Sequence, residues 1–194
     1  MTIVLIAAVA FLIGSIPNGY IIGRLFFRTD IRKSGSGNIG AMNALRTIGK
    51  AGGAAVFVLD AVKGFIPPFL VLLYGLPSWA AAVAAAFAVL GHCYSPWLGW
   101  KGGKGVATSF GAIFALAWPA GLVAVAGWAI GAAVTRYSSV GSMLGSILAA
   151  IALWFFTRDP SFTAYGIFAA VFILYTHREN IARLLAGREN AIKL

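Results

Sequence analysis

Residues 106–135 read VATSFGAIFALAWPAGLVAVAGWAIGAAVT, a run without a single charged residue. An uncharged apolar run of this length is typical of membrane-crossing helix rather than of a soluble core. Pro119 cannot continue a helix interior, and Gly121 permits a tight reversal of the chain. We therefore predict two spans here, 106–119 and 120–135, although both are shorter than the ~20 residues that a straight span needs.

Similar apolar runs occur along the whole chain. Of its 194 residues, 60% are hydrophobic and only 10% are charged, whereas about a quarter of the residues in a soluble domain are charged. Too few polar residues remain to cover a soluble core. The sequence therefore predicts an all-α, polytopic integral membrane helix bundle in which residues 1–194 form a single domain. The seven expected transmembrane helices are 2–23, 52–75, 79–98, 106–119, 120–135, 141–157 and 161–177.

The distribution of Lys and Arg predicts how the bundle is oriented. No cation precedes the first apolar run, so it lacks the charged start of a removable signal peptide. With seven spans, 14 of the 15 Lys and Arg residues fall on one side of the membrane or at that end of a span, and only Arg158 does not. A six-span topology, with the two short spans fused, would spoil this asymmetry. The positive-inside rule then places the N-terminus outside and the C-terminus in the cytoplasm.

The loop after the first span carries a group of hydrogen-bonding side chains. Its glycines let backbone N–H groups approach an anion closely, and Ser36, Asn38 and Asn43 could add side-chain hydrogen bonds. Arg46 could hold an oxyanion through two N–H groups. A flexible linker with a capping serine would not explain these side chains together. We predict a phosphate-handling loop.

A second loop holds glycines between two lysines. Lys101, Gly102, Gly103, Lys104 and Gly105 form a sequence suited to a glycine cradle with two ammonium groups. It is not a Walker A motif, because the first glycine and the hydroxyl residue of that motif are missing. Phosphate binding is therefore predicted, but nucleotide hydrolysis is not. The alternative is a tight turn with lysines that serve only topology.

Polar residues also lie inside or at the ends of spans. Asp60 and Lys63 are one helical turn apart, and a structural ion pair is at least as good an interpretation as a functional carboxylate. Ser142 is expected at a helix start, where its hydroxyl could cap the helix or bind phosphate. His92 is expected at a span end in a structural or hydrogen-bonding role.

The segment after the last span completes the set of candidates. His177 can act as a base or as a phosphate donor, and Asn180 would share a helix face with it. Glu179 is expected to pair with a nearby cation. A plain amphipathic tail is the alternative. With Cys93 as the single cysteine and no Cys/His cluster, the sequence predicts neither a disulfide nor a metal site.

Taken together, these segments resemble the acyl-phosphate-dependent glycerol-3-phosphate acyltransferases of bacterial membranes. The resemblance covers nearly the full length and rests on Gly14-Ser-Ile-Pro-x-Gly-Tyr20, Ser34-Gly-Ser-Gly-Asn-Ile-Gly40 with Asn43 and Arg46, Asp60-Ala-Val-Lys-Gly64, Lys101-Gly-Gly-Lys-Gly-Val-Ala-Thr108, and His177-Arg-x-Asn-Ile-x-Arg183. It implies a seven-span fold with a cytoplasmic active site. It also implies transfer of a fatty acyl group from acyl phosphate to the 1-hydroxyl of glycerol 3-phosphate, which gives lysophosphatidic acid in the first step of bacterial phospholipid synthesis.

The resemblance further implies partners and roles. The expected partners are acyl phosphate, glycerol 3-phosphate and the lipid bilayer, with a functional link to an enzyme that produces acyl phosphate and with no cofactor. Ser36 and Arg46 would be needed for activity, and His177 and Asn180 would belong to the catalytic set. The resemblance also assigns phosphate binding to Gly102, Gly103, Lys104 and Gly105 and a structural role to Glu179. From the residues themselves we add Asn38, Asn43, Lys101 and Ser142 as phosphate ligands, and Asp60 and Lys63 as structural support.

The chemistry fits this interpretation. An acyl phosphate is already activated, so positioning and oxyanion stabilisation can be enough. No Ser–His–Asp arrangement suggests an acyl-enzyme, so we predict direct attack by the substrate hydroxyl. The proton could pass to His177 or to a substrate phosphate, and the sequence does not choose between them. A phosphate transporter would need polar residues deep within several spans, a structural subunit would leave the loops unexplained, and no motif indicates nucleic-acid binding.

Overall fold

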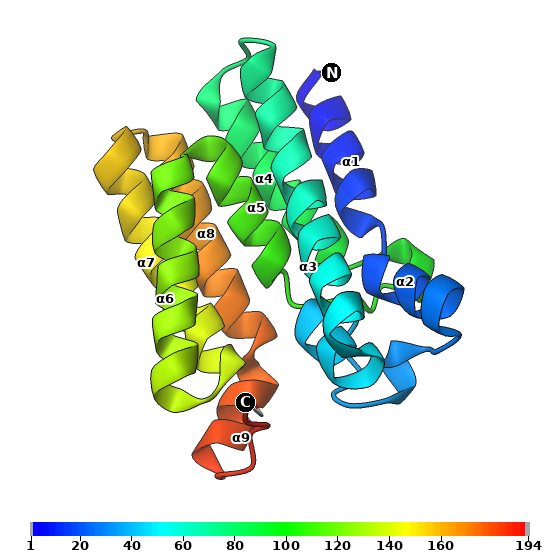
Figure 1. The fold of residues 1–194 in the computed structure, drawn as a ribbon. Helices are drawn as coiled ribbons and strands as arrows, with labels where there is room; N and C mark the ends of the chain where they lie inside the picture. The colour runs from blue at the N-terminus through cyan, green and yellow to red at the C-terminus, as the bar shows by residue number, and fades with distance from the viewer. Residues whose placement is uncertain (1, 193–194) are drawn as a thin grey trace.

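The computed structural model describes residues 2–192, and these form an all-helical protein (Figure 1). The predicted helical class is confirmed. The N-terminus lies at one end of the bundle, and α2, α9 and the C-terminal tail lie at the other (Figure 1). In chain order the helices are α1 (Thr2–Ser15), α2 (Asn18–Phe27), η1 (Ile31–Lys33), α3 (Ala41–Leu73), α4 (Ser78–Cys93), η2 (Pro96–Leu98), α5 (Val106–Leu116), α6 (Trp118–Thr135), α7 (Ser138–Thr157), α8 (Pro160–Thr176) and α9 (Arg178–Leu185).

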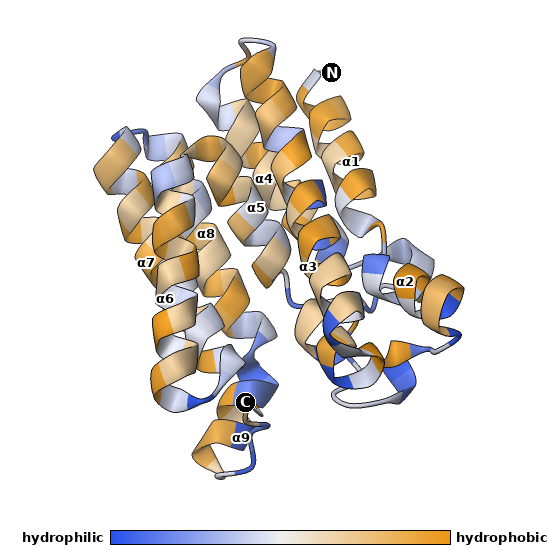
Figure 2. Cartoon of the chain, in the orientation of Figure 1, coloured by the Kyte–Doolittle hydropathy of each residue, from blue (hydrophilic) through white to orange (hydrophobic). Residues whose placement is uncertain are grey.

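The long helices are apolar over most of their length (Figure 2). Five segments of residues 2–192 are long and apolar enough to cross a membrane, namely Thr2–Phe27, Ala41–Leu73, Ser78–Leu98, Trp118–Thr135 and Ser138–Thr157. Two more of the predicted spans correspond to α5 and α8, which are apolar but have only 11 and 17 residues. Hydrophilic residues gather at the end of the bundle that carries α2 and α9 (Figure 2). Lys193, one of the predicted cytoplasmic cations, lies outside the described residues.

The first predicted span is not one continuous helix. We expected a helix over 2–23, but α1 ends at Ser15 and α2 begins at Asn18. The cause is Pro17, which disfavours helical backbone in the residue before it and has no N–H to donate. The Lys63 ammonium binds the carbonyl oxygen of Ile16 at this break, at 2.6 Å. A buried break is tolerated because another part of the protein satisfies the freed backbone group.

The reversal between α5 and α6 was predicted two residues too late. It occurs at Ala117, whose φ of −160° and ψ of 101° are extended, and Pro119 lies in the first turn of α6. The first turn of a helix accepts proline readily, because its N–H groups have no partner within the helix. Gly121 is therefore not part of the reversal. It lies within α6, where an added Cβ would come within 2.5 Å of the Phe114 ring.

Two helices begin earlier than the apolar runs suggested. The expected span 52–75 belongs to α3, which begins at Ala41 and contains one non-helical residue, Gly49, with a φ of 80°. The expected span 141–157 belongs to α7, which begins at Ser138. Polar side chains that we assigned to loops therefore lie on the first turns of helices.

Glycines bring the helix backbones together. An added Cβ at Gly64 of α3 would lie 1.9 Å from the carbonyl oxygen of Thr108 in α5, and one at Gly111 of α5 would lie 2.0 Å from the carbonyl oxygen of Ala61 in α3. The same holds between α1 and α4, where a Cβ at Gly14 would meet the Ala88 oxygen at 2.0 Å. Small residues at such contacts are typical of membrane helices, which associate through close packing.

We predict that Gly64→Val will destabilise the fold, because the larger side chain must force α3 away from α5. Overpacking of this kind costs about 1–3 kcal/mol or more. The thermal unfolding midpoint of the detergent-purified protein measures the effect. Ala55→Val is the matched control, since Ala55 is exposed on the same helix. Equal midpoints for the two variants would contradict this packing.

Candidate active site

A cavity of about 440 Å³ lies at the end of the bundle where three helices begin. Its walls include Ala41 and Met42 at the start of α3, Val106 and Ala107 at the start of α5, and the start of α7. The first N–H groups of each helix have no partner within the helix, and the helix dipole is positive at that end. The cavity is thus suited to anions even before any side chain is considered.

The first loop is held in shape by Asn43. Its side-chain oxygen accepts the backbone N–H of Ser36 at 2.8 Å, and its amide nitrogen donates to the carbonyl oxygens of Ile31 and Asn38 at 2.7 and 2.8 Å. Asn43 is 2% exposed. Because its hydrogen bonds go to the loop backbone, it fixes where Ser36 lies. The Asn38 side chain accepts the Gly40 N–H at 2.8 Å and closes the turn before α3.

The glycine loop is built differently from our expectation. We predicted that its N–H groups would cradle a phosphate, but those of Gly102 and Gly103 donate to the carbonyl oxygens of Cys93 and His92, at 2.9 and 3.1 Å. These glycines are required for close packing, since an added Cβ at Gly103 would lie 2.0 Å from Nε2 of His92. Gly105, with a φ of 83°, makes the left-handed turn that starts α5.

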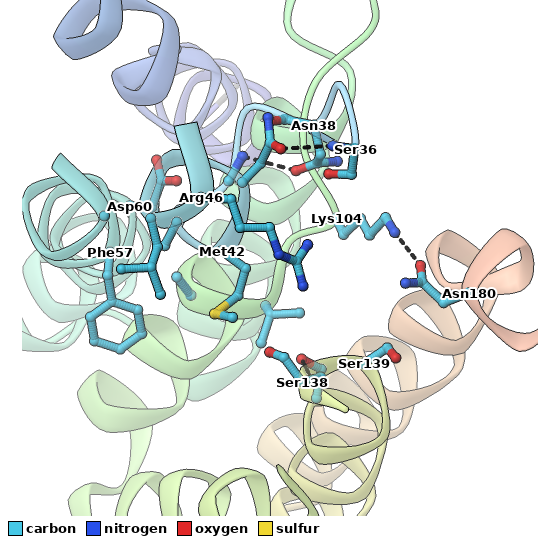
Figure 3. A pocket seen from close by; sticks show the side chains of 18 of the residues that line it. Ser36, Asn38, Met42, Arg46, Phe57, Asp60, Lys104, Ser138, Ser139 and Asn180 are labelled. Carbon is cyan, nitrogen blue, oxygen red and sulfur yellow. Dashed lines mark hydrogen bonds between the residues drawn. The ribbon is translucent and has the colours of Figure 1, made fainter. Parts of the chain in front are cut away.

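Lys104 is the residue of this loop that projects into the cavity, where it donates to the side-chain oxygen of Asn180 (Figure 3). The backbone carbonyl of Lys104 accepts the Thr176 hydroxyl at 3.0 Å, which ties the loop to the end of α8. Burial, and then the nearby Arg183, lower the pKa of the Lys104 ammonium. Its charge is therefore held in a partly dehydrated place, where it interacts strongly with an anion.

Glu189 is the buried carboxylate of the site, and it was missed in the sequence. Its oxygens accept hydrogen bonds from Ser139 at 2.9 Å, from Asn180 at 2.6 Å and from Arg183 at 2.7 Å. Burial alone would raise the pKa of Glu189, but these three hydrogen bonds outweigh burial and hold the pKa below its usual range. The chain has only five acidic residues, so an acidic residue within the basic C-terminal tail could have been selected as a candidate from the sequence.

Two further candidates reach the same cavity. His177, at the junction of α8 and α9, is 4% exposed, and its Nδ1 lies 2.8 Å from the carbonyl oxygen of Ile173. A carbonyl can only accept, so Nδ1 carries the proton in the neutral ring, and Nε2 is left as its basic position. Arg46 lies on α3 and extends toward the cavity centre (Figure 3), and its guanidinium donates to the backbone carbonyl of Asn190 at 3.3 Å.

Asp60, which also lines the cavity, forms the predicted ion pair with Lys63, with 2.8 Å between Oδ1 and Nζ. Both side chains are at most 5% exposed, so the pair lies inside the helix bundle. Asp60 also accepts a hydrogen bond from Asn18 at 3.0 Å, and Nδ1 of His92 lies 3.7 Å from the same oxygen. His92 thus has the structural position expected at the end of α4.

Three predicted residues differ from our expectation in position or contacts. Ser142 lines the cavity but cannot cap α7, because the helix begins four residues earlier and its hydroxyl donates to the Ser138 carbonyl at 2.8 Å. Lys101 and Glu179 line a neighbouring cavity of about 410 Å³, which shares Ser36, Asn38, Lys104 and Arg183 with the first. Among residues 2–192, Glu179 has no ion-pair partner within 4.0 Å. We expected Glu179 to be the paired carboxylate of this segment, but that position is held by Glu189.

Over the described part of the chain, no three His, Cys, Asp or Glu side chains gather closely enough to hold a metal ion. The cavity has apolar walls as well, formed by Leu45, Phe57 and Trp128.

The fold and the cavity define an integral membrane protein with cations, amides and hydroxyls gathered at one end of a helix bundle. The family model described as glycerol-3-phosphate acyltransferase matches residues 4–187. A protein named glycerol-3-phosphate acyltransferase from Synechococcus sp. (strain JA-3-3Ab) is 42% identical over 192 residues, which cover 99% of this chain and 94% of that protein. One of the same name from Erythrobacter litoralis (strain HTCC2594) is 45% identical, covering 94% of this chain and 91% of that protein.

Solved structures agree with these relatives. The crystal structure of PlsY (YgiH), an integral membrane glycerol 3-phosphate acyltransferase, in its glycerol 3-phosphate form, has a TM-score of 0.93 and 38% identity, covering 100% of this chain and 96% of that one. The lysophosphatidic acid form has a TM-score of 0.91 and 36% identity at the same coverage. The chain belongs to the PlsY-type glycerol-3-phosphate acyltransferase family.

We predict that Asp60→Asn will destabilise the protein by about 3–5 kcal/mol, because it leaves the buried Lys63 ammonium without a charged partner. Removing both charges, in Asp60→Asn with Lys63→Met, is expected to recover part of this loss. Unfolding of the detergent-purified variants measures both effects. Glu179→Gln is the control, because an exposed side chain should change stability by no more than about 0.5 kcal/mol. A double variant less stable than Asp60→Asn would contradict the pairing.

Proposed function

We propose that this protein transfers a fatty acyl group from acyl phosphate to the 1-hydroxyl of glycerol 3-phosphate, forming lysophosphatidic acid without an acyl-enzyme. One observation carries the proposal. Ser36, Arg46, Lys104, His177 and Asn180 come from separate segments of the chain, and all line one cavity. Both substrates bear a phosphate, and this cavity combines Arg46 and Lys104 with three helix N-termini.

The geometry supports a direct transfer. The hydroxyl oxygen attacks the acyl carbonyl carbon, the bond from that carbon to the phosphate oxygen breaks, and inorganic phosphate leaves with the electron pair. Arg46 and Lys104 bind the phosphates, and the N–H groups at the start of α5 and Ser36 stabilise the developing oxyanion. The hydroxyl proton passes to Nε2 of His177 or to a substrate phosphate. Asn180 orients the Lys104 ammonium through the hydrogen bond between them.

The acyl chain is expected on the apolar side of the cavity. Phe57 and Met42 lie on the opposite side of Arg46 from the Lys104–Asn180 pair (Figure 3). We assign the wall formed by Leu45, Phe57 and Trp128 to the first carbons of the chain. One cavity would thus hold the charged and the apolar parts of the acyl phosphate together.

We also propose that α1 and α3 to α8 all cross the membrane, with the cavity on the cytoplasmic side of the bacterial inner membrane. The short helices α5 and α8 pack within the bundle, and seven of the eleven residues of α5 are buried. The hydrophilic end in Figure 2 is the end with most of the Lys and Arg residues, as the positive-inside rule requires. An acyl-phosphate-producing enzyme of the cytoplasm would supply the donor.

The first test uses purified protein with palmitoyl phosphate and radiolabelled glycerol 3-phosphate, with palmitoyl-CoA in parallel and with a chelator present. We expect lysophosphatidic acid from the acyl phosphate alone, because only this donor has its phosphate bonded directly to the acyl carbon that reacts. No product from folded protein would refute the proposal, and uptake of labelled glycerol 3-phosphate into liposomes would then test a transporter.

A second test concerns the proton acceptor. If His177 is the base, His177→Ala should lower turnover at saturating substrate by about 10²–10⁴-fold, the usual contribution of general base catalysis. The measurement is kcat, with the thermal midpoint as the control for folding. Near-normal turnover in a folded variant would exclude the histidine and leave a substrate phosphate as the acceptor.

A further inference from the structure

We propose that Glu189 is a positioning residue for the transfer reaction, acting through Asn180 to hold the Lys104 ammonium toward the substrate phosphate. This inference rests on the proposed function. Glu189 lies in the C-terminal tail, beyond the last helix, yet its side chain is only 6% exposed. Its carboxylate contacts one residue of α7 and two of α9.

The hydrogen bonds form a chain with a fixed direction. A carboxylate can only accept, so the amide nitrogen of Asn180 must face Glu189, at 2.6 Å. The amide oxygen of Asn180 is then directed to the other side, where Lys104, which can only donate, binds it. Both partners select the same orientation of the amide, and without the carboxylate the amide would be held only by the ammonium that it positions. Glu189 therefore sets the orientation of Asn180, and Asn180 sets that of the ammonium.

The tail is folded back so that Glu189 can reach this position. After α9, Gly187 adopts a φ of 65°, and the Arg188 N–H donates to the Arg183 carbonyl at 2.8 Å, which reverses the chain. Beyond Glu189, the Asn190 carbonyl accepts from Arg46, and the Ile192 N–H donates to the Arg136 carbonyl at 2.8 Å. The tail is thus attached to α3 and to the turn before α7.

The pairing of Glu189 also distinguishes Arg183 from Arg46 and Lys104. Its second oxygen pairs with Nε of Arg183 at 2.7 Å, so this guanidinium has a carboxylate partner. In the described part of the chain, Arg46 and Lys104 have no carboxylate within 4.0 Å. Their charges remain available to substrate phosphates. Loss of the carboxylate would leave Arg183 as a competing phosphate ligand in the wrong place.

Glu189→Gln tests the inference, because it keeps the size of the side chain and removes the charge and the obligate acceptor. We expect kcat/KM to fall at least about tenfold, as for other charge-assisted contacts. Arg188→Gln is the matched control, since it changes the charge of the same tail by one unit at an exposed neighbour, and it should stay within twofold of the unmodified protein. Where Glu189→Gln does not fold, Glu189→Asp keeps the buried charge with a shorter reach, and about a threefold loss is expected.

A double-mutant cycle separates positioning from a general effect on structure. In an Asn180→Ala background, Glu189→Gln should lower kcat/KM less than twofold further, because its effect runs through Asn180. If that background has no measurable turnover, the same cycle is measured on the dissociation constant for inorganic phosphate. Equal losses with and without Asn180, or a loss within twofold in Glu189→Gln alone, would overturn the inference. An unmodified protein that makes no lysophosphatidic acid would instead refute the proposed function, and the phosphate cycle would still decide the role of Glu189.

Discussion

The site depends on one buried ion pair, between Asp60 and Lys63 of α3. Two charges out of water are stable only when other polar groups complete their hydrogen bonds, and here those groups belong to other helices. Lys63 binds the carbonyl freed at the break between α1 and α2, and Asp60 faces His92 at the end of α4. His92 in turn packs against Gly103 of the glycine loop. Through these contacts, the ion pair supports the glycine loop that carries Lys104.

The cavity is positively charged because the chain has few acidic residues. The chain carries 15 Lys and Arg residues but only five Asp and Glu, and two of these acids, Asp60 and Glu189, line the cavity. Each is paired with a cation of its own, Lys63 and Arg183. The remaining positive charge, together with three helix N-termini in a partly dehydrated space, is left to ligands. Few carboxylates means little competition for the phosphate-binding groups.

Much of this arrangement could be predicted from sequence, and the errors have physical causes. Apolar runs located the long helices, because membrane spans need length and hydrophobicity and little else. They could not locate Ser138 or Ala41 as helix starts, since polar residues can extend a helix beyond its apolar part. Spacing brought His177 and Asn180 to one site, because it is a local relation. Glu189 was missed because its contacts with α7 depend on how the tail folds back, which no local pattern encodes.

The glycine loop shows why residue type alone can mislead about mechanism. Glycine permits a close approach of backbone to an anion, and equally of backbone to another part of the protein. Here the second use applies at Gly102 and Gly103, whose N–H groups bind the end of α4. This packing holds the loop so that α5 begins directly after Gly105, and its first residues, Val106 and Ala107, line the cavity. The loop thus contributes to anion binding by positioning Lys104 and the N-terminus of α5. Its glycines are required for packing against α4 and not for direct contact with the ligand.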